Sequence, residues 1–381
     1  MVGGEIVSKE IKEVQKKIET TVEERIYLAS QWKLIWWKFK RHKLALISLW
    51  IIGILYFIVL FCEFLAPYDP NRMFKDYIYA PPTIVYFFDD GRITRPFVYG
   101  LTSRLNLETF RREVVQDRRT KYRIRLFYRG DIYRFWGLFE TNLHLFGVDE
   151  GVIFLFGTDN LGRDIFSRVL YGARISLTIG LVGIFFSLIL GILFGGLAGY
   201  FGGLIDELIM RGVDTLVSIP TLPLWMCLSA VLPRDWPIVR TYFAITIILS
   251  VVGWAGLARV IRGKFLSLKD DDFVTAARLA GCNELRIIFR HLFPSSLSYI
   301  IVSITLSIPN MILGETALSF LGLGLQPPAI SWGVLLQQAQ DLNAMRNYPW
   351  ILIPCFFVFI SVLMFNFLGD GLRDAADPYA R

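Results

Sequence analysis

This 381-residue sequence has few histidines and cysteines, the residues that most often serve in catalysis or metal binding, and they lie far apart along the chain. The histidines and cysteines are scattered and form no Cys-x-x-Cys pair, so we expect neither a metal site nor a disulfide framework. No nucleophile–base arrangement and no Walker A pattern for nucleotide binding is present. The sequence therefore predicts no catalytic residue, no metal and no cofactor bound by this chain. The scattered residues are His42, His144, His291, Cys62, Cys227, Cys282 and Cys355.

Glu315 is the acidic residue that could face a cavity, near the outer end of a long apolar segment. Ionisable residues inside such segments are costly and usually functional. Glu315, with Ser319 and Trp332, is therefore a candidate for a translocation path or outer gate, although a neutral packing or helix-capping role is equally open. Other charges deep in the apolar segments are almost absent, which argues against an ion-coupled carrier and a proton relay.

These apolar segments set the fold class. The chain is 54% hydrophobic and only 19% charged, outside the range of ordinary soluble domains. A hydrocarbon core of about 30 Å needs roughly 20 apolar residues as a helix. We therefore predict an all-α polytopic membrane protein with six transmembrane helices. Pro220 and Pro223 interrupt the third, and Gly253, Trp254 and Gly256 loosen the fourth. The predicted spans are Leu44 to Leu65, Ile175 to Tyr200, Leu216 to Leu232, Tyr242 to Val260, Leu297 to Leu318 and Trp350 to Leu368.

Basic residues predict the orientation. Lys38, Lys40, Arg41 and Lys43 precede the first span, which places the amino terminus in the cytoplasm. Six spans return the carboxyl terminus to the same side, and they also place the basic loop after the fourth span inside. We expect no cleavable signal peptide, because the apolar run follows a charged segment and is too long.

Composition divides the chain into parts. Residues 1–43 are predicted to form a cytoplasmic amphipathic helix, and residues 44–66 the first transmembrane helix. Residues 67–156 form a polar extracytoplasmic insert. Its segments PTIVYFF, KYRIRLFYRGDIYRFWGL and NLHLFG, with Asp-Asp-Gly and Arg-Gly-Asp turns, indicate a β-rich domain. Its location argues against nucleic-acid binding and favours docking of another protein. Residues 157–381 form the core transmembrane domain.

Gly191, Gly195 and Gly199 recur every four residues in the second span. Small residues at this spacing share one helix face and let helix backbones approach closely in lipid. The spacing predicts close helix packing, either inside one subunit or at a dimer seam.

Residues 262–294 interrupt the membrane pattern with a charged, amphipathic segment. Apolar residues recur at three- and four-residue spacing, which predicts two short helices broken at Gly281, with Asn283 as the N-cap of the second. Ala276, Ala277, Ala280 and Gly281 give this loop a small-residue surface. The pair either lies on its own protein or receives a partner.

TAARLAG (275–281) followed by HLFP (291–294) resembles the EAA loop of permease subunits in binding-protein-dependent ABC importers. Further segments are similar to the second permease subunit of dipeptide, oligopeptide and nickel importers, which are prokaryotic inner-membrane proteins. In this chain Thr275 replaces the usual glutamate, His291 an isoleucine and Phe293 a leucine. The further segments are GTDNLGRDIFSRVLYGARISL (157–177), AGYFGGLIDELIMRGVDTLVSIP (198–220), ETALSFLGLGLQPPAISWG (315–333) and GDGLRDAADP (369–378).

The resemblance implies a type I importer permease fold and a function in ATP-driven uptake of di- or oligopeptides. The expected partners are a homologous permease, two ATP-binding subunits that hold ATP and Mg, an extracytoplasmic binding protein and membrane lipid. It also implies that residues 262–294 couple to the ATPases through Thr275, Ala276, Ala277, Ala280, Gly281, Asn283 and Pro294. Uptake of oligosaccharides or nickel, and a role as a membrane scaffold or receptor without transport, are the alternatives.

GTDNLGRD and LGLGLQPPAISWG are expected near the outer face. They form either part of a vestibule or tight turns in which Asp159, Arg163 and Asp164 pair locally.

Overall fold

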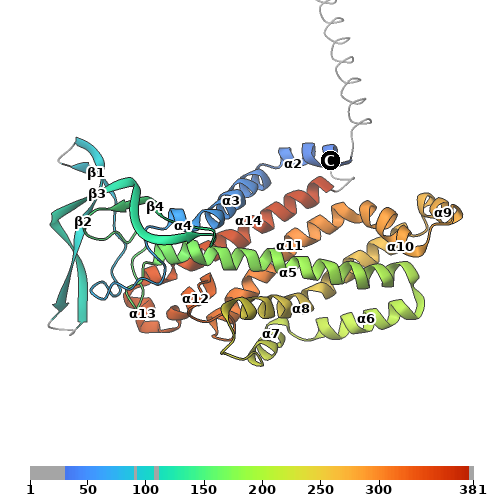
Figure 1. Cartoon of the computed structure of the whole chain (residues 1–381). Helices are drawn as coiled ribbons and strands as arrows, with labels where there is room; N and C mark the ends of the chain where they lie inside the picture. Colours follow the sequence, from blue (N-terminus) through green and yellow to red (C-terminus); the bar gives the residue numbers. More distant parts are fainter. Residues whose placement is uncertain (1–30, 90–91, 107–110, 377–381) are drawn as a thin grey trace, which may run out of the picture.

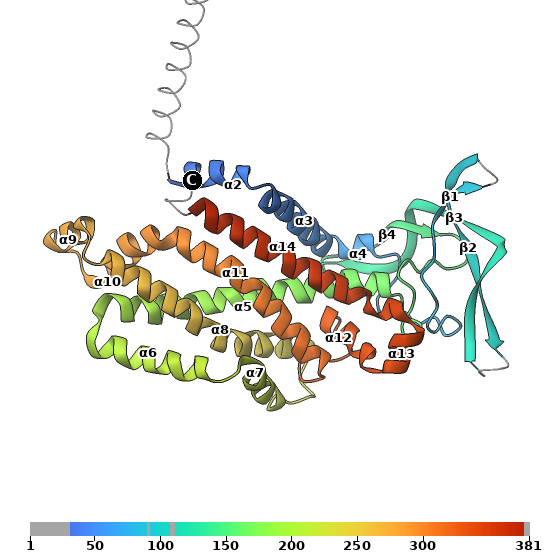
Figure 2. The same ribbon diagram turned by 180° about the vertical axis from the view of Figure 1, so that it is seen from behind.

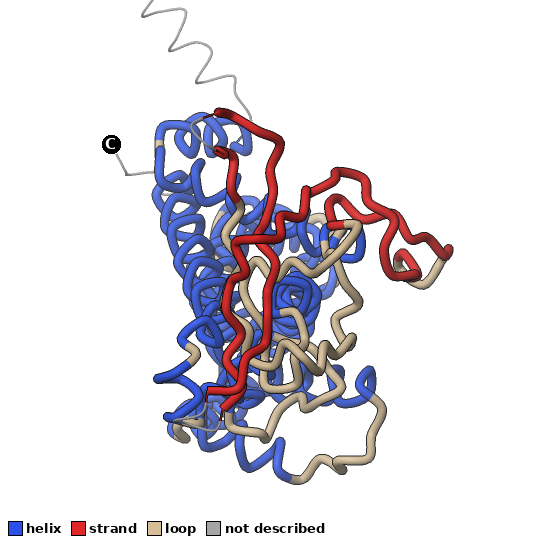
Figure 3. The backbone as a smooth tube through the Cα atoms, turned by 90° about the vertical axis from the view of Figure 1, so that its left-hand side faces the viewer, coloured by secondary structure: helices blue, strands red, loops and turns tan. Residues whose placement is uncertain are grey.

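The computed structural model describes residues 31–89, 92–106 and 111–376, which form a long helical bundle with a sheet at one end (Figure 1). Figure 3 looks onto that end and shows the strands in front of the helices. Most of the predicted amino-terminal helix of residues 1–43 lies outside the described residues. Its described part is the amphipathic helix α2 (Gln31–Arg41).

Within the described ranges, five helices are long and apolar enough to cross a membrane, or six if one bent pair is a single span. Shorter helices connect them. The spanning helices are α3 (Lys43–Leu60), α5 (Ile165–Phe201), α8 (Ile238–Leu268), α11 (Phe293–Phe320) and α14 (Ile353–Ala376). The shorter ones are α4 (Cys62–Leu65), α9 (Asp272–Leu279), α10 (Glu284–Ile287), η1 (Ile288–Leu292), α12 (Trp332–Leu336), η2 (Gln337–Gln340), α13 (Leu342–Asn347) and η3 (Pro349–Leu352).

The predicted third span, Leu216 to Leu232, is interrupted by proline as expected, but the helix before the break begins well before the predicted bound. The chain forms α6 (Gly203–Ser218) and α7 (Thr221–Ala230), which are bent by 89° at the break between them. Pro220 explains the break, because proline lacks an N–H donor and pushes the preceding residue into an extended conformation. Ile219 has that conformation, with φ −86° and ψ 131°.

The other spans also differ from their predicted bounds, and local geometry explains the difference in two of them. The first span stops at Leu60, because Phe61 leaves helical geometry before the short α4 begins. The second begins at Ile165 and not at 175, because Asp164 caps α5 by accepting a hydrogen bond from the Ser167 backbone N–H. This cap allows the helix to include the polar residues that a hydropathy window excludes.

The three glycines of the second span lie where α5 packs against α8. A Cβ atom on Gly195 would lie 2.8 Å from the Cα atom of Ala258, and one on Gly199 would lie 2.8 Å from the backbone oxygen of Arg262. The structure therefore places these glycines in a close contact between two helices of the same chain.

A four-stranded antiparallel sheet, in the order β1-β2-β3-β4, lies between α4 and α5. The three segments predicted to be β-rich overlap β1, β3 and β4. The prediction of a turn at Arg-Gly-Asp is wrong, because residues 129–131 lie inside β3. The register between β3 and β4 shifts there, between Arg129 and Tyr133. The strands are β1 (Tyr86–Asp89), β2 (Arg92–Asn106), β3 (Arg111–Phe135) and β4 (Phe139–Val148).

The two ends of the molecule carry different structures. Helices α9 and α10 project at one end of the bundle, and the sheet lies at the other, as Figures 1 and 2 show from opposite sides. Helix α5 has 37 residues and passes between these ends. At 1.5 Å per residue it is about 55 Å long.

Candidate functional site

The segment from α9 to α10 is a helix–turn–helix whose turn is set by Gly281 and Asn283. Gly281 has φ +76°, its N–H bonds to the carbonyl of Arg278, and the N–H of Cys282 bonds to the carbonyl of Ala277. These two bonds make a Schellman motif, which favours glycine because the left-handed conformation crowds a Cβ atom. Asn283 then caps α10 by accepting a hydrogen bond of 2.9 Å from the Arg286 N–H, as predicted.

Not all of the small residues of this segment are exposed. Ala276, Ala280 and Gly281 are at the surface, and a Cβ atom on Gly281 would have no neighbour within 4 Å. Ala277, by contrast, is only 8% exposed and packs inward. The small surface that a partner could approach is therefore narrower than the sequence predicted.

The inner face of α9 and α10 packs firmly onto the bundle. Val274 and Ala277 from α9 join Ile287 and Ile288 in a buried cluster with Phe265 of α8 and Tyr200 of α5. The guanidinium group of Arg278 also lies over the Tyr200 ring, 5.5 Å from its centroid. The inner face of α9 is thus in direct contact with the ends of α5 and α8.

The outer face of the same segment is apolar and exposed. Leu279 is 85% exposed, and Leu285, Phe289 and Phe273 are also at the surface. Thr275, which stands where the resembling family has glutamate, is exposed on α9. This exposed group of side chains, opposite a packed inner face, is typical of a surface that receives another protein.

Pro294 does not end the second helix, contrary to the predicted separation of loop and span. The helix from α10 continues through a π-helical turn, η1, into α11. The Phe293 N–H bonds to the carbonyl of Ile288, and Pro294 follows in the first turn of α11, where its missing N–H is tolerated. Helix α10 and the fifth span are therefore parts of one continuous helix, Glu284–Phe320.

Ion pairs tie α6 to α8 beside this segment. Asp206 pairs with Arg262 through two hydrogen bonds, and Asp214 pairs with Arg259 at 2.7 Å. Arg211 pairs within α6, with Glu207 at 2.7 Å. These charges serve contacts between neighbouring helices.

Glu315, Ser319 and Trp332 lie inside a packed polar cluster. The Glu315 carboxylate accepts hydrogen bonds from the hydroxyl groups of Ser331 at 2.7 Å, Ser319 at 2.8 Å and Ser176 at 3.2 Å. Trp332 donates its backbone N–H to Ser176 at 3.1 Å and is fully buried. The cluster joins α5, α11 and the segment before α12. All of its side chains are buried in this conformation.

Three polar residues on one face of α11 were not predicted from the sequence to line a cavity. Ser303, Ser307 and Asn310 follow each other at helical spacing and line a cavity of about 620 Å³ between α6, α7, α8 and α11. Asn310 is exposed although it lies in the middle of a spanning helix. Polar residues at i, i+4 and i+7 within SITLSIPN could have revealed this face, since such residues usually face a cavity or the bundle interior.

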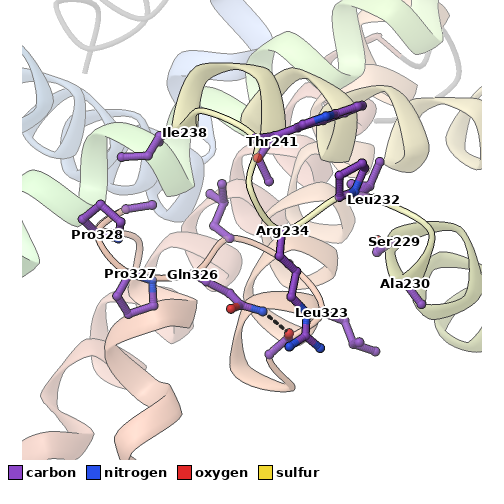
Figure 4. Close-up of a pocket in the computed structure, with 16 residues that line it drawn as sticks. Ser229, Ala230, Leu232, Arg234, Ile238, Thr241, Leu323, Gln326, Pro327 and Pro328 are labelled. Carbon is purple, nitrogen blue, oxygen red and sulfur yellow. Dashed lines mark hydrogen bonds between the residues drawn. The ribbon is translucent and has the colours of Figure 1, made fainter.

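Gly/Pro-rich residues 322–329 help to form a smaller cavity of about 200 Å³ beside the loop that joins α7 to α8 (Figure 4). Gln326 donates a hydrogen bond of 2.6 Å to the carbonyl of Gly322, which closes the turn. Arg234 and Thr241 line the other side, so the cavity has both charged and neutral polar groups.

The other Gly-rich motif, at residues 157–164, forms a tight ionic turn, as one of its two interpretations predicted. Arg163 pairs with Asp159 at 2.7 Å, and both side chains are nearly buried. Burial raises the pKa of Asp164 to about 7, although hydrogen bonds from Ser167 act in the opposite direction. Among the described residues, no group of three histidine, cysteine, aspartate or glutamate side chains could hold a metal ion.

Comparisons with known proteins agree with this architecture. Residues 30–82 match the N-terminal TM domain of oligopeptide transport permease C. The oligopeptide transport system permease protein OppC of Bacillus subtilis (strain 168) is 40% identical over 227 residues, which cover 59% of this chain and 72% of that one. The di/tripeptide transport system permease protein DppC of Pseudomonas aeruginosa (strain UCBPP-PA14) is 33% identical over 347 residues, 91% of each chain.

A solved structure of the MetNI methionine ABC transporter in an inward facing conformation covers 55% of this chain and 96% of its own, with 18% identity and a TM-score of 0.43. Residues 191–381, which contain the α9–α10 segment, α11 and α14, match the binding-protein-dependent transport system inner membrane component family. The family match and the OppC and DppC relatives confirm the resemblance found in the sequence: the chain belongs to the family of inner membrane components of binding-protein-dependent transport systems.

Proposed function

We propose that this chain forms, with a homologous permease, the translocation pathway for di- and oligopeptides, and that α9 and α10 receive the ATP-binding subunits. The observation that supports this most directly is the two-faced helix pair. Its outer face exposes Leu279, Leu285 and Phe289, while its inner face is packed on α5 and α8. A partner bound there would move the spans as a rigid body, which is what a transporter driven from outside its own chain needs.

Peptides are the favoured substrate class because the OppC and DppC relatives are named for oligopeptide and di/tripeptide transport. Oligosaccharides and nickel remain the alternatives within this class of importer. The path itself is assigned to the cavity that Ser303, Ser307 and Asn310 line, since hydroxyl and amide groups can exchange hydrogen bonds with a passing peptide backbone. Glu315, Ser319 and Trp332 would then position α11 and α12 around the outer gate without touching substrate.

The orientation follows from the basic residues. The end that carries α2, α9 and α10 is proposed to be cytoplasmic, because it bears Lys38, Lys40, Arg41 and the basic loop after α8. The sheet at the opposite end would face outward, together with the cavity around residues 322–329, and would meet the substrate-binding protein. In this arrangement ATP and Mg lie on the partner subunits, and this chain has no enzymatic role of its own.

Substitution of Gly281 tests the proposed docking surface. Gly281→Trp adds bulk where a Cβ atom would have no neighbour within 4 Å, so co-purification with the ATP-binding subunits and substrate-stimulated ATP hydrolysis should be lost. Gly281→Ala is the matched control, because its Cβ atom brings the same strain to the left-handed turn while adding little bulk, and it should keep both properties. Intact assembly and hydrolysis in Gly281→Trp would show that the ATPases do not dock here.

Transport by the assembled complex separates this function from a scaffold or receptor. Proteoliposomes that contain all the subunits and the binding protein should take up labelled peptides when ATP is supplied. A scaffold would assemble with the same partners and show no uptake. Identification of the ligand held by the co-purified binding protein would decide between peptides, oligosaccharides and nickel.

A further inference from the structure

One face of α3 is bulky, apolar and exposed along its whole length. Its residues recur at alternating steps of three and four, so they form a single stripe. Trp50 is 74% exposed and Phe57 is 57% exposed, whereas Ala45, Ser48 and Val59 on the opposite face are buried. The stripe continues past the end of α3 into α4, and its residues are Ile47, Trp50, Ile54, Phe57, Phe61 and Phe64.

The hairpin between β3 and β4 is fixed beside the end of this stripe. The Trp136 indole N–H donates a 2.9 Å hydrogen bond to the carbonyl of Leu60, which would otherwise lack a helical partner. The Arg174 guanidinium lies 4.3 Å from the Trp136 ring centroid and pairs with Glu63 at 2.6 Å. The hairpin turn is therefore held at the depth of the last turn of α3.

An apolar groove of about 620 Å³ separates the hairpin from α3 and α4. Phe57, Phe61 and Phe64 form one wall, and Phe135, Phe139 and Leu143 form the other. The polar groups of the hairpin wall are satisfied internally, since the Tyr133 hydroxyl donates to the carbonyl of Leu143 at 2.6 Å. The groove thus has the size of a ligand site and favours an occupant with no hydrogen-bonding groups.

Two kinds of membrane partner could fill this groove: a lipid chain, or a helix of another subunit. Helices in membranes associate through small residues that allow their backbones to approach. The α3 stripe is instead built from isoleucine, phenylalanine and tryptophan, with Gly53 as its one small neighbour within the described chain. The groove also opens directly onto the exposed α3 stripe, and Tyr133 and Trp136 beside it are of the two residue types that gather at membrane–water interfaces.

We propose that the groove between α3–α4 and the β3–β4 hairpin binds an acyl chain of a membrane phospholipid, in the leaflet at the carboxyl end of α3. The hairpin would hold this chain against the first span, and Leu138, which is 81% exposed at the turn, would enter the same leaflet. The proposal requires only that the chain crosses a membrane. It is independent of the proposed substrate and partner subunits.

Photo-crosslinking tests the proposal on the complete transporter in lipid nanodiscs. The probe is a phosphatidylcholine with a diazirine on one acyl chain, and adducts are mapped by mass spectrometry. Peptides that contain residues 57–65 and 135–143 should be labelled. In Phe135→Asn/Phe139→Asn, labelling of residues 57–65 should fall about tenfold, because two aromatic contacts to the chain are lost, while labelling of the stripe from Ile47 to Ile54 should persist.

The matched control is Phe88→Asn/Ile93→Asn, which changes two exposed apolar residues elsewhere in the sheet, 66% and 82% exposed. It should leave groove labelling unchanged. Phe139→Leu guards against misfolding, since it keeps the groove apolar and should keep the adducts. Absence of groove adducts while the stripe is labelled would mean that another subunit covers the groove. That result, or an equal loss in both double variants, would overturn the proposal.

Discussion

The contact between α5 and α8 allows a quantitative test with a pair of glycine substitutions. In Gly195→Ala, the added methyl group would lie 2.8 Å from the Cα atom of Ala258, which is backbone and cannot rotate away. Overpacking of this kind costs about 1–3 kcal/mol. In Gly263→Ala, on the facing helix, the methyl group would have no neighbour within 4 Å.

Both substitutions gain about 1 kcal/mol of intrinsic helix propensity, so this term cancels when the two variants are compared. We therefore expect Gly195→Ala to be less stable than Gly263→Ala by about 1–3 kcal/mol. The measurement is the free energy of unfolding of each purified full-length variant in the same mixed micelles, followed by circular dichroism during titration with denaturing detergent.

Equal stability of the two variants would refute the close approach of α5 and α8. A dimer seam makes a different prediction. If the glycines met another subunit, Gly195→Ala would weaken co-purification of the permease pair and leave the stability of the isolated chain close to that of Gly263→Ala.

Three further outcomes follow from named side chains. Burial raises the pKa of Asp164 to about 7, above its ordinary pKa near 3.8. The stabilising contribution of this carboxyl group is therefore full below pH 3.8 and is lost as pH rises through 7. Asp164→Asn should remove this part of the pH dependence of the melting temperature. Asn283→Ala should cost about 1 kcal/mol and speed hydrogen exchange of α10, whereas Asn283→Asp should not. Glu315→Ala removes the acceptor of three serine O–H donors and should lower stability by about 1–3 kcal/mol in the same detergent titration, more than Glu315→Gln.

The features that the sequence predicted correctly are those set by neighbours along the chain. Gly281 ends α9 because the left-handed turn needs a glycine within two residues of the last helical turn, and Asn283 caps α10 through a bond three residues away. The apolar runs of α3, α5, α8, α11 and α14 are likewise local properties. The membership of the family was also readable, since its motifs are continuous segments.

The features that were missed depend on residues far apart in the sequence. Pro220 predicts an interruption within residues 216–232, but it does not show that the chain turns by 89° there. The sequence left both a gate role and a packing role open for Glu315. Its hydrogen-bond partners Ser176 and Ser331 come from other segments of the chain, and only the fold shows that they surround its carboxylate. Whether Ala277 faces outward also depended on its packing against α8 and η1, which helical periodicity alone does not determine.

Helix α5 gives these parts a common mechanical element. At its amino-terminal end, Val169, Ala173 and Leu177 pack in the cluster that contains Trp332. At its carboxyl-terminal end, Tyr200 packs with the inner face of α9. Because protein interiors are densely packed and deform little, a displacement of α9 must either move α5 as a unit or break the Tyr200 contacts. If the ATP-binding subunits dock on α9 as proposed, the long helix, and not the loops, is the part of this chain that links their motion to the proposed outer gate.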